Sequence, residues 1–248
     1  MNDTAMNQKT DRVLFVWLLL ACLFGALIGL PWVVAVTRDP ATAWRLAGSS
    51  LLQLVPACAV GVWLGPKVGL GSGLRELVSR TPGAWEAVRA GLVPGTLVGV
   101  AMGAVVFLGV SSMPKEALIP GLDDPTIFEV FLRCLSAGIT EEITFRFGLM
   151  TLLVWVVRAS LKRPATDATS QWVGNLLAAV LFGAAHLPGL PAAAWNPALL
   201  VPIVMVNAAA AMLMGWLFMR YGLVSAICAH FVADVVQGVI PRLVAVIT

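Results

Sequence analysis

Three charged side chains stand inside one long apolar stretch of the chain, between Glu141 and Arg146. A charge at the centre of a bilayer costs roughly 2.5–3.5 kcal/mol on the insertion scale, so such groups are functional unless they neutralise one another. Glu142 and Arg146 are four residues apart with the acid first, which is the favourable order for an ion pair on a helix. Glu142 therefore either neutralises Arg146 and supports the site or takes part in the chemistry.

Glu141 differs from its neighbour because successive helical residues point about 100° apart. It has no basic partner at helical spacing on its own segment. Desolvation makes an unpaired buried carboxylate a stronger base, and a carboxylate of this kind can act as a general base near neutral pH. We therefore expect Glu141 to be catalytic.

The chain has only two histidines, His186 and His230, and both lie in apolar segments. Phe182 precedes His186 by four residues, and Asp234 follows His230 by four, so each pair shares a helical face. Counted at 1.5 Å per residue from the predicted inner boundaries, Glu141, His186, His230 and Asp234 lie at roughly 25, 22, 14 and 20 Å. The hydrocarbon core is ~30 Å thick, so these side chains share the middle-to-outer part of it. Side chains that form one shared site must lie at a similar depth in the membrane, and these four meet that requirement.

The composition predicts the scaffold that positions these residues. Hydrophobic residues make up 59% of the 248 positions and charged residues only 12%, and the mean hydropathy is +0.91. A soluble globule of this size cannot bury that much apolar surface, and a disordered chain needs low hydrophobicity. The apolar stretches are continuous, which disfavours a membrane β-barrel. The net charge of +3 is scattered, so we expect a lipid bilayer and no nucleic acid as partner.

The sequence therefore predicts an all-α, polytopic membrane helix bundle with about seven transmembrane helices, in a range of six to eight, around an intramembrane polar site. Residues 1–12 are expected to be a disordered tail, and residues 13–248 a single integral-membrane domain with the catalytic motifs within 134–240. The expected spans are residues 13–36, 46–66, 90–114, 134–157, 171–187, 199–219 and 221–240.

Three further features concern topology and packing. Lys and Arg are more frequent on one set of connections, ten against five, which places the N-terminus in the cytoplasm. The connection 67–89 is either an interfacial amphipathic helix, broken near residue 82, or an ordinary loop. Gly95, Gly99 and Gly103 form a small-residue face on the third span, which predicts a close helix contact.

The ordered set Glu-Glu-x-x-x-Arg, Phe-x-x-x-His and His-x-x-x-Asp on three spans resembles the CaaX-protease and bacteriocin-processing (CPBP, or Abi) family. The resemblance covers about residues 134–240 and implies an all-helical intramembrane protease in a membrane, here expected to be the bacterial cytoplasmic membrane. The family's motif residues correspond to Glu141, Glu142, Arg146, His186 and His230. The last motif position is usually Asn in the family, whereas this chain has Asp234.

The resemblance and the residues together predict one mechanism. Glu141, assisted by His186, deprotonates a water that attacks a peptide carbonyl, and His230 and Asp234 face the developing oxyanion. Asp234 can donate to an oxyanion only if it is protonated; otherwise it orients His230. Phe182, Glu142 and Arg146 support the site.

The same residues also allow a second mechanism and other functions. Glu141, His186 and His230 could instead be three ligands of a catalytic zinc ion, although we favour a site without a cofactor because there is no H-E-x-x-H pair. A catalytically silent scaffold or self-immunity protein of the same fold is the alternative function, followed by a small proton-coupled transporter. For a peptidase, the expected substrate is a membrane-anchored or membrane-inserted peptide or protein.

Overall fold

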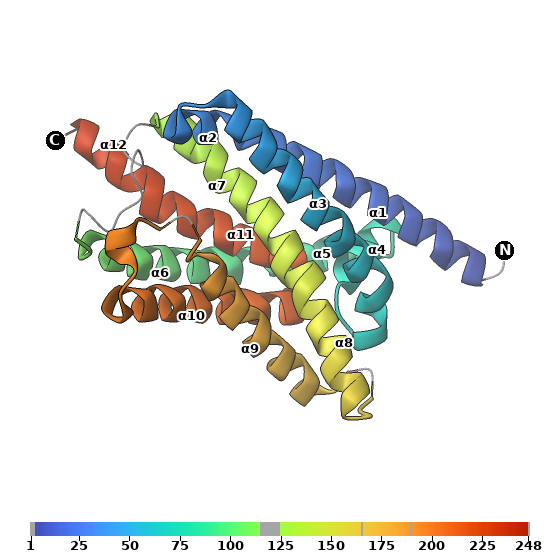
Figure 1. Ribbon diagram of the computed structural model, residues 1–248. Coiled ribbons are helices and arrows are strands. Elements are labelled where there is room, and N and C mark those ends of the chain that lie inside the picture. Colours follow the sequence, from blue (N-terminus) through green and yellow to red (C-terminus); the bar gives the residue numbers. More distant parts are fainter. Residues whose placement is uncertain (1–2, 115–124, 165, 189, 248) are drawn as a thin grey trace.

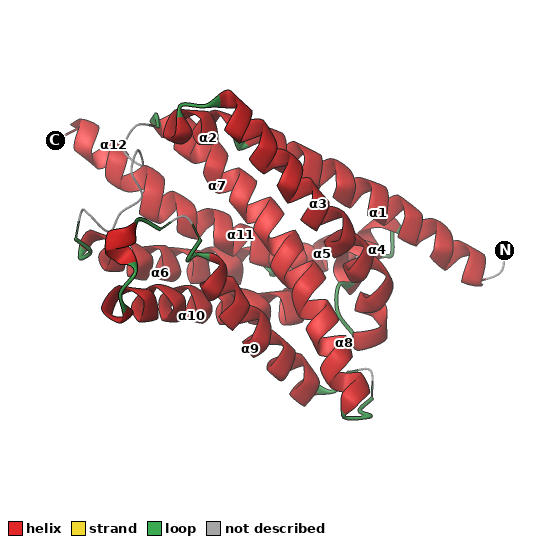
Figure 2. Ribbon diagram, in the orientation of Figure 1, coloured by secondary structure: helices red, strands yellow, loops and turns green. Residues whose placement is uncertain are grey.

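The computed structural model describes residues 3–114, 125–164, 166–188 and 190–247, and within these ranges it contains helices and loops but no strand (Figures 1 and 2). The all-α prediction is confirmed. The helices in chain order are α1 (Asp3–Ile28), α2 (Leu30–Thr37), α3 (Pro40–Leu64), η1 (Gly65–Val68), α4 (Ser72–Val78), α5 (Ala84–Ala90), α6 (Leu92–Ser111), α7 (Ile127–Glu142), η3 (Ile143–Met150), α8 (Thr151–Ser160), α9 (Ala168–Ala185), η4 (Ala192–Ala194), α10 (Pro197–Tyr221), α11 (Leu223–Asp234), η5 (Val235–Val239) and α12 (Ile240–Ile247).

Six helical stretches of the described chain are long and apolar enough to cross a membrane, which lies within the predicted range. They are Met6–Thr37, Pro40–Val68, Ala84–Ser111, Ile127–Ser160, Pro197–Tyr221 and Leu223–Ile247. The expected fifth span corresponds to α9, which is outside this set. Its first turns contain Gln171 and Asn175, whose side chains donate to the carbonyls of Val68 and Met212 on neighbouring elements.

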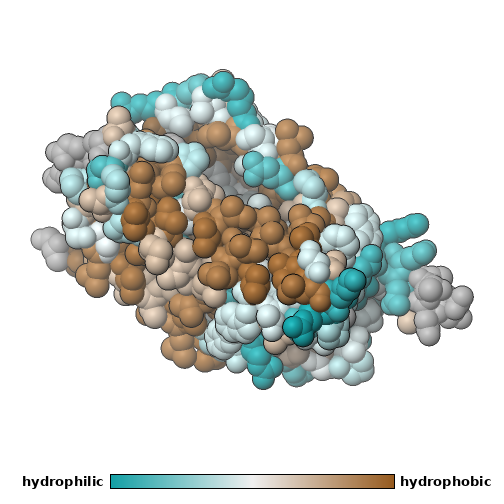
Figure 3. Space-filling model, turned by 60° about the horizontal axis from the view of Figure 1, so that its bottom comes forward, coloured by the Kyte–Doolittle hydropathy of each residue, from teal (hydrophilic) through white to brown (hydrophobic). Residues whose placement is uncertain are grey.

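Large apolar side chains cover much of the outer surface. Leu52, Leu97 and Leu108 are among the most exposed, each with about two-thirds or more of its surface accessible. Figure 3 shows apolar residues across the middle of one face, with hydrophilic residues toward its upper edge and lower right. Apolar surface of this extent is stable in contact with lipid chains rather than water. The chain is therefore an integral membrane protein.

The segment α7–η3–α8 runs as one long rod through the molecule (Figure 1). α1 packs against α7, and α3 packs against η3. On the other side α7 packs against α11, which in turn packs closely on α6, while α9 packs against both α8 and α10. The rod therefore contacts the helices that carry every other candidate site residue.

Side-chain caps fix where several helices begin. Asp39 accepts hydrogen bonds at the start of α3, and the hydroxyl of Thr42 contributes most to holding the pKa of Asp39 below its usual range. Asp167 caps α9 in the same way, and its hydrogen bond from the Ser170 hydroxyl lowers the pKa of that carboxyl. These caps satisfy backbone N–H groups that have no partner within the helix.

The helices α1 and α7 begin earlier than the sequence predicts. Thr126 and Glu129 form a capping box, so α7 starts seven residues before residue 134 and includes Arg133. Residues 3–12, expected to be a disordered tail, form the first turns of α1. There the Asp11 carboxylate pairs with Arg75 of α4 at 2.5 Å, which ties this part of α1 to the bundle.

The connection 67–89 contains two short helices, α4 and α5, with a turn between them at Gly83. Gly83 has φ +82°, a conformation that residues with a Cβ rarely adopt. α10 and α11 are joined in the tight turn that the sequence predicts, through Gly222 alone, which has φ +87°. Both turns depend on glycine.

The predicted glycine face of α6 lies directly on α11. A Cβ added at Gly99 would come within 2.5 Å of the Ala229 carbonyl oxygen, and one at Gly103 within 2.6 Å of the Ala233 carbonyl oxygen. Small residues allow two helix backbones to approach this closely. This contact sets the distance of α11, which carries His230 and Asp234, from the rest of the bundle.

Gly99→Val should therefore destabilise the protein by about 1–3 kcal/mol, the usual cost of overpacking a close contact. The measurement is thermal unfolding of the purified protein in detergent. Gly109→Ala on the same helix is the control, because a Cβ there meets nothing within 4 Å. Equal unfolding temperatures for both variants would contradict the close α6–α11 contact.

Candidate active site

Two charged motifs are each followed by a π-helical segment. η3 begins directly after Glu142, and η5 begins directly after Asp234. π-Helical turns are rare in proteins and are frequent at functional sites. The helical register changes at the residues whose side chains form the site.

Glu142 is the most deeply buried of the site carboxylates, with 0% of its surface exposed. Its Oε1 lies 2.9 Å from Nη1 of Arg146 and accepts a 2.7 Å hydrogen bond from Nδ1 of His230. The ion pair predicted from the four-residue spacing is confirmed. One carboxylate oxygen at the end of α7 therefore contacts Arg146 of η3 and His230 of α11, which lies 88 residues further along the chain than Glu142.

Arg146 is also buried and contacts two further helices. Its guanidinium lies over the Phe182 ring of α9, 4.5 Å from the centroid, and its Nη2 lies 3.4 Å from Sδ of Met214 on α10. An arginine over an aromatic face is stabilised by the ring quadrupole. The predicted supporting residues Glu142, Arg146 and Phe182 thus form one connected group.

His230 is held in a fixed orientation by Glu142. An ionised carboxylate only accepts hydrogen bonds, so Nδ1 of His230 is the donor to Glu142 and Nε2 points to the other side. Nε2 lies 3.8 Å from Oε2 of Glu141 and 3.9 Å from Oδ2 of Asp234. The ring is 6% exposed. His230 is therefore placed between the buried ion pair and the other two carboxylates.

Glu141 and Glu142 face different surroundings although they are adjacent in sequence. The side chain of Glu141 is 33% exposed, whereas that of Glu142 is fully buried. Within the described residues Glu141 has no ion pair with Lys or Arg, and its nearest ionisable partner is His230. Glu141 can therefore be reached by a ligand and also lies close to the buried His230.

His186 reaches the site through an aromatic ring rather than through a polar contact. It caps the C-terminal end of α9, where its Nδ1 donates to the Phe182 carbonyl at 2.9 Å, because a carbonyl can only accept. The Phe182 ring lies 4.7 Å from the His186 ring and 6.1 Å from the His230 ring, between centroids. The described part of the chain shows no hydrogen bond from His186 to Glu141.

Asp234 is 4% exposed, and each of its carboxylate oxygens has a donor. Oδ2 lies 3.1 Å from Nη1 of Arg133 on α7, and Oδ1 accepts from Nε2 of Gln237 at 2.6 Å. The Arg133 guanidinium also lies over the Trp32 ring, 5.4 Å from its centroid. Asp234 is thus part of an ion pair that crosses from α11 to α7.

Neither Arg133 nor Gln237 is among the site residues that the sequence predicts. The predicted fourth span begins at residue 134, so Arg133 falls in an outer connection. The pattern Thr126-x-x-Glu129 is a capping-box signal that would have extended the helix to include Arg133. Gln237 lies three residues after Asp234, a spacing that places two side chains on neighbouring positions of a helix.

The three candidate zinc ligands, Glu141, His186 and His230, do not form one ligand group. In the part of the chain that the structure describes, no set of three or more His, Cys, Asp or Glu side chains is placed to hold a metal ion. A catalytic zinc site needs three protein ligands around one ion.

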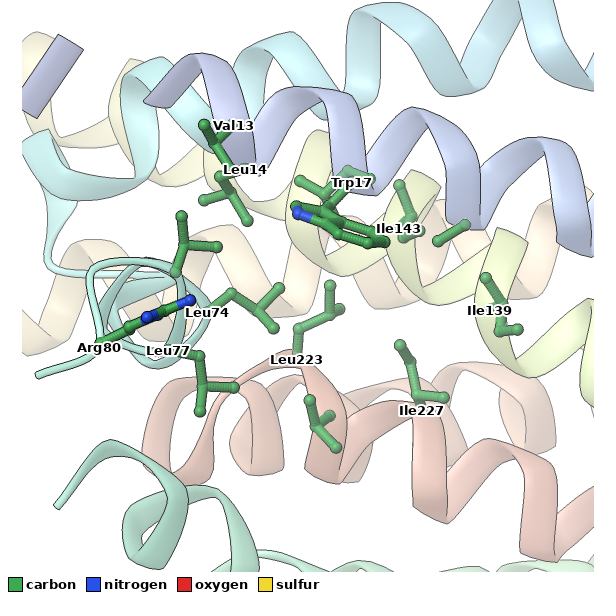
Figure 4. A pocket seen from close by; sticks show the side chains of 14 residues that line it. Val13, Leu14, Trp17, Leu74, Leu77, Arg80, Ile139, Ile143, Leu223 and Ile227 are labelled. Carbon is green, nitrogen blue, oxygen red and sulfur yellow. The ribbon is translucent and has the colours of Figure 1, made fainter. Parts of the chain in front are cut away.

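An apolar pocket of about 570 Å³ lies beside the site, between α1, α4, α7 and α11 (Figure 4). Ile143, which follows Glu142, and Ile227, one helical turn before His230, both line it. Trp17 and Leu74 contribute from α1 and α4, and Arg80 is the charged residue among the described side chains of its wall. The pocket therefore borders the helices that carry the charged cluster.

Glu142→Gln should destabilise the protein strongly, by roughly 3–5 kcal/mol, because it leaves the Arg146 charge buried without a partner. Thermal unfolding in detergent measures this effect. Glu141→Gln is the matched control: that side chain is one-third exposed and has no arginine partner in the described chain, so its cost should stay below about 1 kcal/mol. Similar losses in both variants would show that the Glu142–Arg146 pair contributes little.

One comparison with known proteins found a similar family. Residues 123–236, a little under half of the chain, match the family described as type II CAAX prenyl endopeptidase Rce1-like. No curated protein and no solved structure matches the chain. The matched region contains all seven candidate site residues, and the resemblance to the CaaX-protease and bacteriocin-processing family is confirmed. Over residues 123–236 the chain is therefore similar to the Rce1-like family of type II CAAX prenyl endopeptidases.

Proposed function

We propose that the protein is an intramembrane endopeptidase that hydrolyses a peptide bond of a membrane-anchored or membrane-inserted substrate. The observation that carries this proposal is the Glu141–His230 pair. A carboxylate that a ligand can reach lies 3.8 Å from the Nε2 of a histidine whose other nitrogen is fixed by a fully buried ion pair. Two atoms at this separation can both hydrogen-bond to one water oxygen.

In this mechanism Glu141 is the general base. It takes a proton from water as the water oxygen bonds to the scissile carbonyl carbon, and the carbonyl oxygen gains negative charge. The C–N bond then breaks, and Glu141 returns the proton to the leaving amine. His230, when its Nε2 carries a proton, donates to the oxyanion, since its Nδ1–H is already engaged by Glu142.

His186 is proposed to assist Glu141. Because Nδ1 of His186 donates to the Phe182 carbonyl, the neutral ring presents Nε2 as an acceptor. The contact of Phe182 with both histidine rings supports a position for His186 near the same reacting groups. Phe182 would then keep the two histidine rings in a fixed arrangement.

The proposal does not use a metal. It rests on the chemistry of a carboxylate base and a histidine donor, both of which are present without further ligands. Metal analysis of the purified protein tests it: stoichiometric zinc that is lost in His186→Ala would contradict the metal-free mechanism and favour a zinc-dependent one.

The pocket in Figure 4 supports a substrate with an apolar group next to the cleaved bond. A lipid-modified C-terminal tail is the first candidate, because the matched family is described by its CAAX prenyl substrates. A bacteriocin leader and a C-terminal membrane anchor have the same general chemistry. We propose the bacterial cytoplasmic membrane as the location, with the N-terminus in the cytoplasm on the charge distribution of the connections.

Glu141→Gln should lower hydrolysis by at least about 10²-fold, which is the usual effect of removing a general base. The measurement compares protein termini in host membranes that contain the wild-type protein or Glu141→Gln at matched expression. Termini that disappear in the variant identify substrates. If no termini change and Glu141→Gln rescues the phenotype of a gene deletion, the protein acts as a scaffold or self-immunity protein instead.

Ala21→Phe should reduce cleavage by placing a ring in the apolar pocket, which Ala21 lines. Because the ring occupies space needed by the substrate, we expect KM to rise more than kcat falls. Ala104→Phe is the matched control, since Ala104 is exposed on α6 and does not line this pocket. Equal activity of the two variants would show that the substrate does not use the pocket.

A further inference from the structure

Arg133 is a second cation of the site, beyond the motif residues. It lies on α7, two helical turns before Glu141, and its Nη1 is 3.1 Å from Oδ2 of Asp234. We propose that Arg133 is a positioning residue that neutralises Asp234, so that the reaction tolerates a carboxylate at this position beside His230. This inference rests on the proposed function, because it concerns the charge felt by the oxyanion.

The distances show which carboxylate of the site pairs with which arginine. Glu142 is neutralised by Arg146 at 2.9 Å, and Asp234 by Arg133 at 3.1 Å. Glu141 is the remaining carboxylate of this cluster, and within the described residues it has no cationic partner apart from His230. The pairing leaves one carboxylate to act as a base.

Without Arg133, the carboxylate of Asp234 would lose the arginine that offsets its charge. Asp234 and Glu141 both face Nε2 of His230, at 3.9 and 3.8 Å. Two uncompensated carboxylates on one histidine nitrogen repel each other and also repel an oxyanion formed nearby. The Arg133 charge removes most of this repulsion at Asp234, and the hydrogen bond from Gln237 occupies the other carboxylate oxygen.

Arg133 is also held in place from its other side. Its guanidinium lies over the Trp32 ring of α2, and its side chain is 36% exposed, whereas the Asp234 side chain is 5% exposed. A buried carboxylate needs a partner with good geometry, and the planar guanidinium fixed between a ring and a carboxylate provides it. The asymmetry of exposure places the arginine at the rim and the carboxylate inside.

A charge-compensation experiment tests the proposal. Peptidase activity and thermal unfolding are measured for the wild-type protein, Arg133→Gln, Asp234→Asn and the double variant. Arg133→Gln should lower kcat roughly tenfold to a hundredfold, the range of a lost hydrogen bond between charged groups, with KM little changed. In the Asp234→Asn background the same change should cost less than about twofold, because no charge needs compensation.

Two further variants serve as controls. Arg133→Lys keeps the charge and should retain more activity than Arg133→Gln. Arg89→Gln makes the same change at an exposed position on α5 and should leave activity unchanged. If Arg133→Gln does not fold, the double variant should fold and be active.

Three results would overturn the inference. They are an equal loss from Arg133→Gln in both backgrounds, an inactive Asp234→Asn protein, and a double variant that does not fold. If the wild-type protein shows no cleavage that depends on Glu141, the proposed function fails instead. The unfolding temperatures of the same four proteins then still test the Arg133–Asp234 ion pair. If the double variant loses less stability than the sum of the two single variants, the pair is supported; if the losses simply add, the pair is contradicted.

Discussion

The structure of the site depends on one buried carboxylate oxygen, Oε1 of Glu142. It accepts a hydrogen bond from His230 and forms an ion pair with Arg146, and both partners are at most 6% exposed. In a low-dielectric interior each of these groups would be costly alone, so the three are stable only together. The shared oxygen therefore requires the end of α7, η3 and α11 to lie side by side, and it fixes which nitrogen of His230 faces Glu141 and Asp234. Phe182 extends the same constraint to α9 through its contact with Arg146.

Adjacent acidic residues serve different purposes because a helix turns them apart. Glu142 points into the bundle and is neutralised, whereas Glu141 is one-third exposed and lacks an arginine partner among the described residues. Burial and charge pairing thus separate a buried, ion-paired carboxylate from one that a ligand can reach. Asp234 resembles Glu142 in being buried and paired, but its partner Arg133 comes from a different helix and lies at the rim.

The membrane environment explains how a small bundle can hold so many charges. The outer surface is apolar and faces lipid, so polar groups within the hydrocarbon region must find partners inside the protein. Close glycine contacts bring α6 onto α11 and leave the polar face of α11 directed at α7. The apolar pocket beside this polar face gives a lipid-like group a place next to the charged cluster.

Several structural features of this protein could be predicted from local patterns in the sequence alone. Long apolar runs set the helical spans, the four-residue spacing set the Glu142–Arg146 pair, and the spacing of Gly95, Gly99 and Gly103 set a close helix face. Each of these depends on residues near one another in the chain. Only the tertiary structure decided that Glu142 holds His230 and that Arg133 pairs with Asp234, 88 and 101 residues away. Such contacts depend on the rotation and depth at which α7 and α11 pack, which helical periodicity within a single span does not specify.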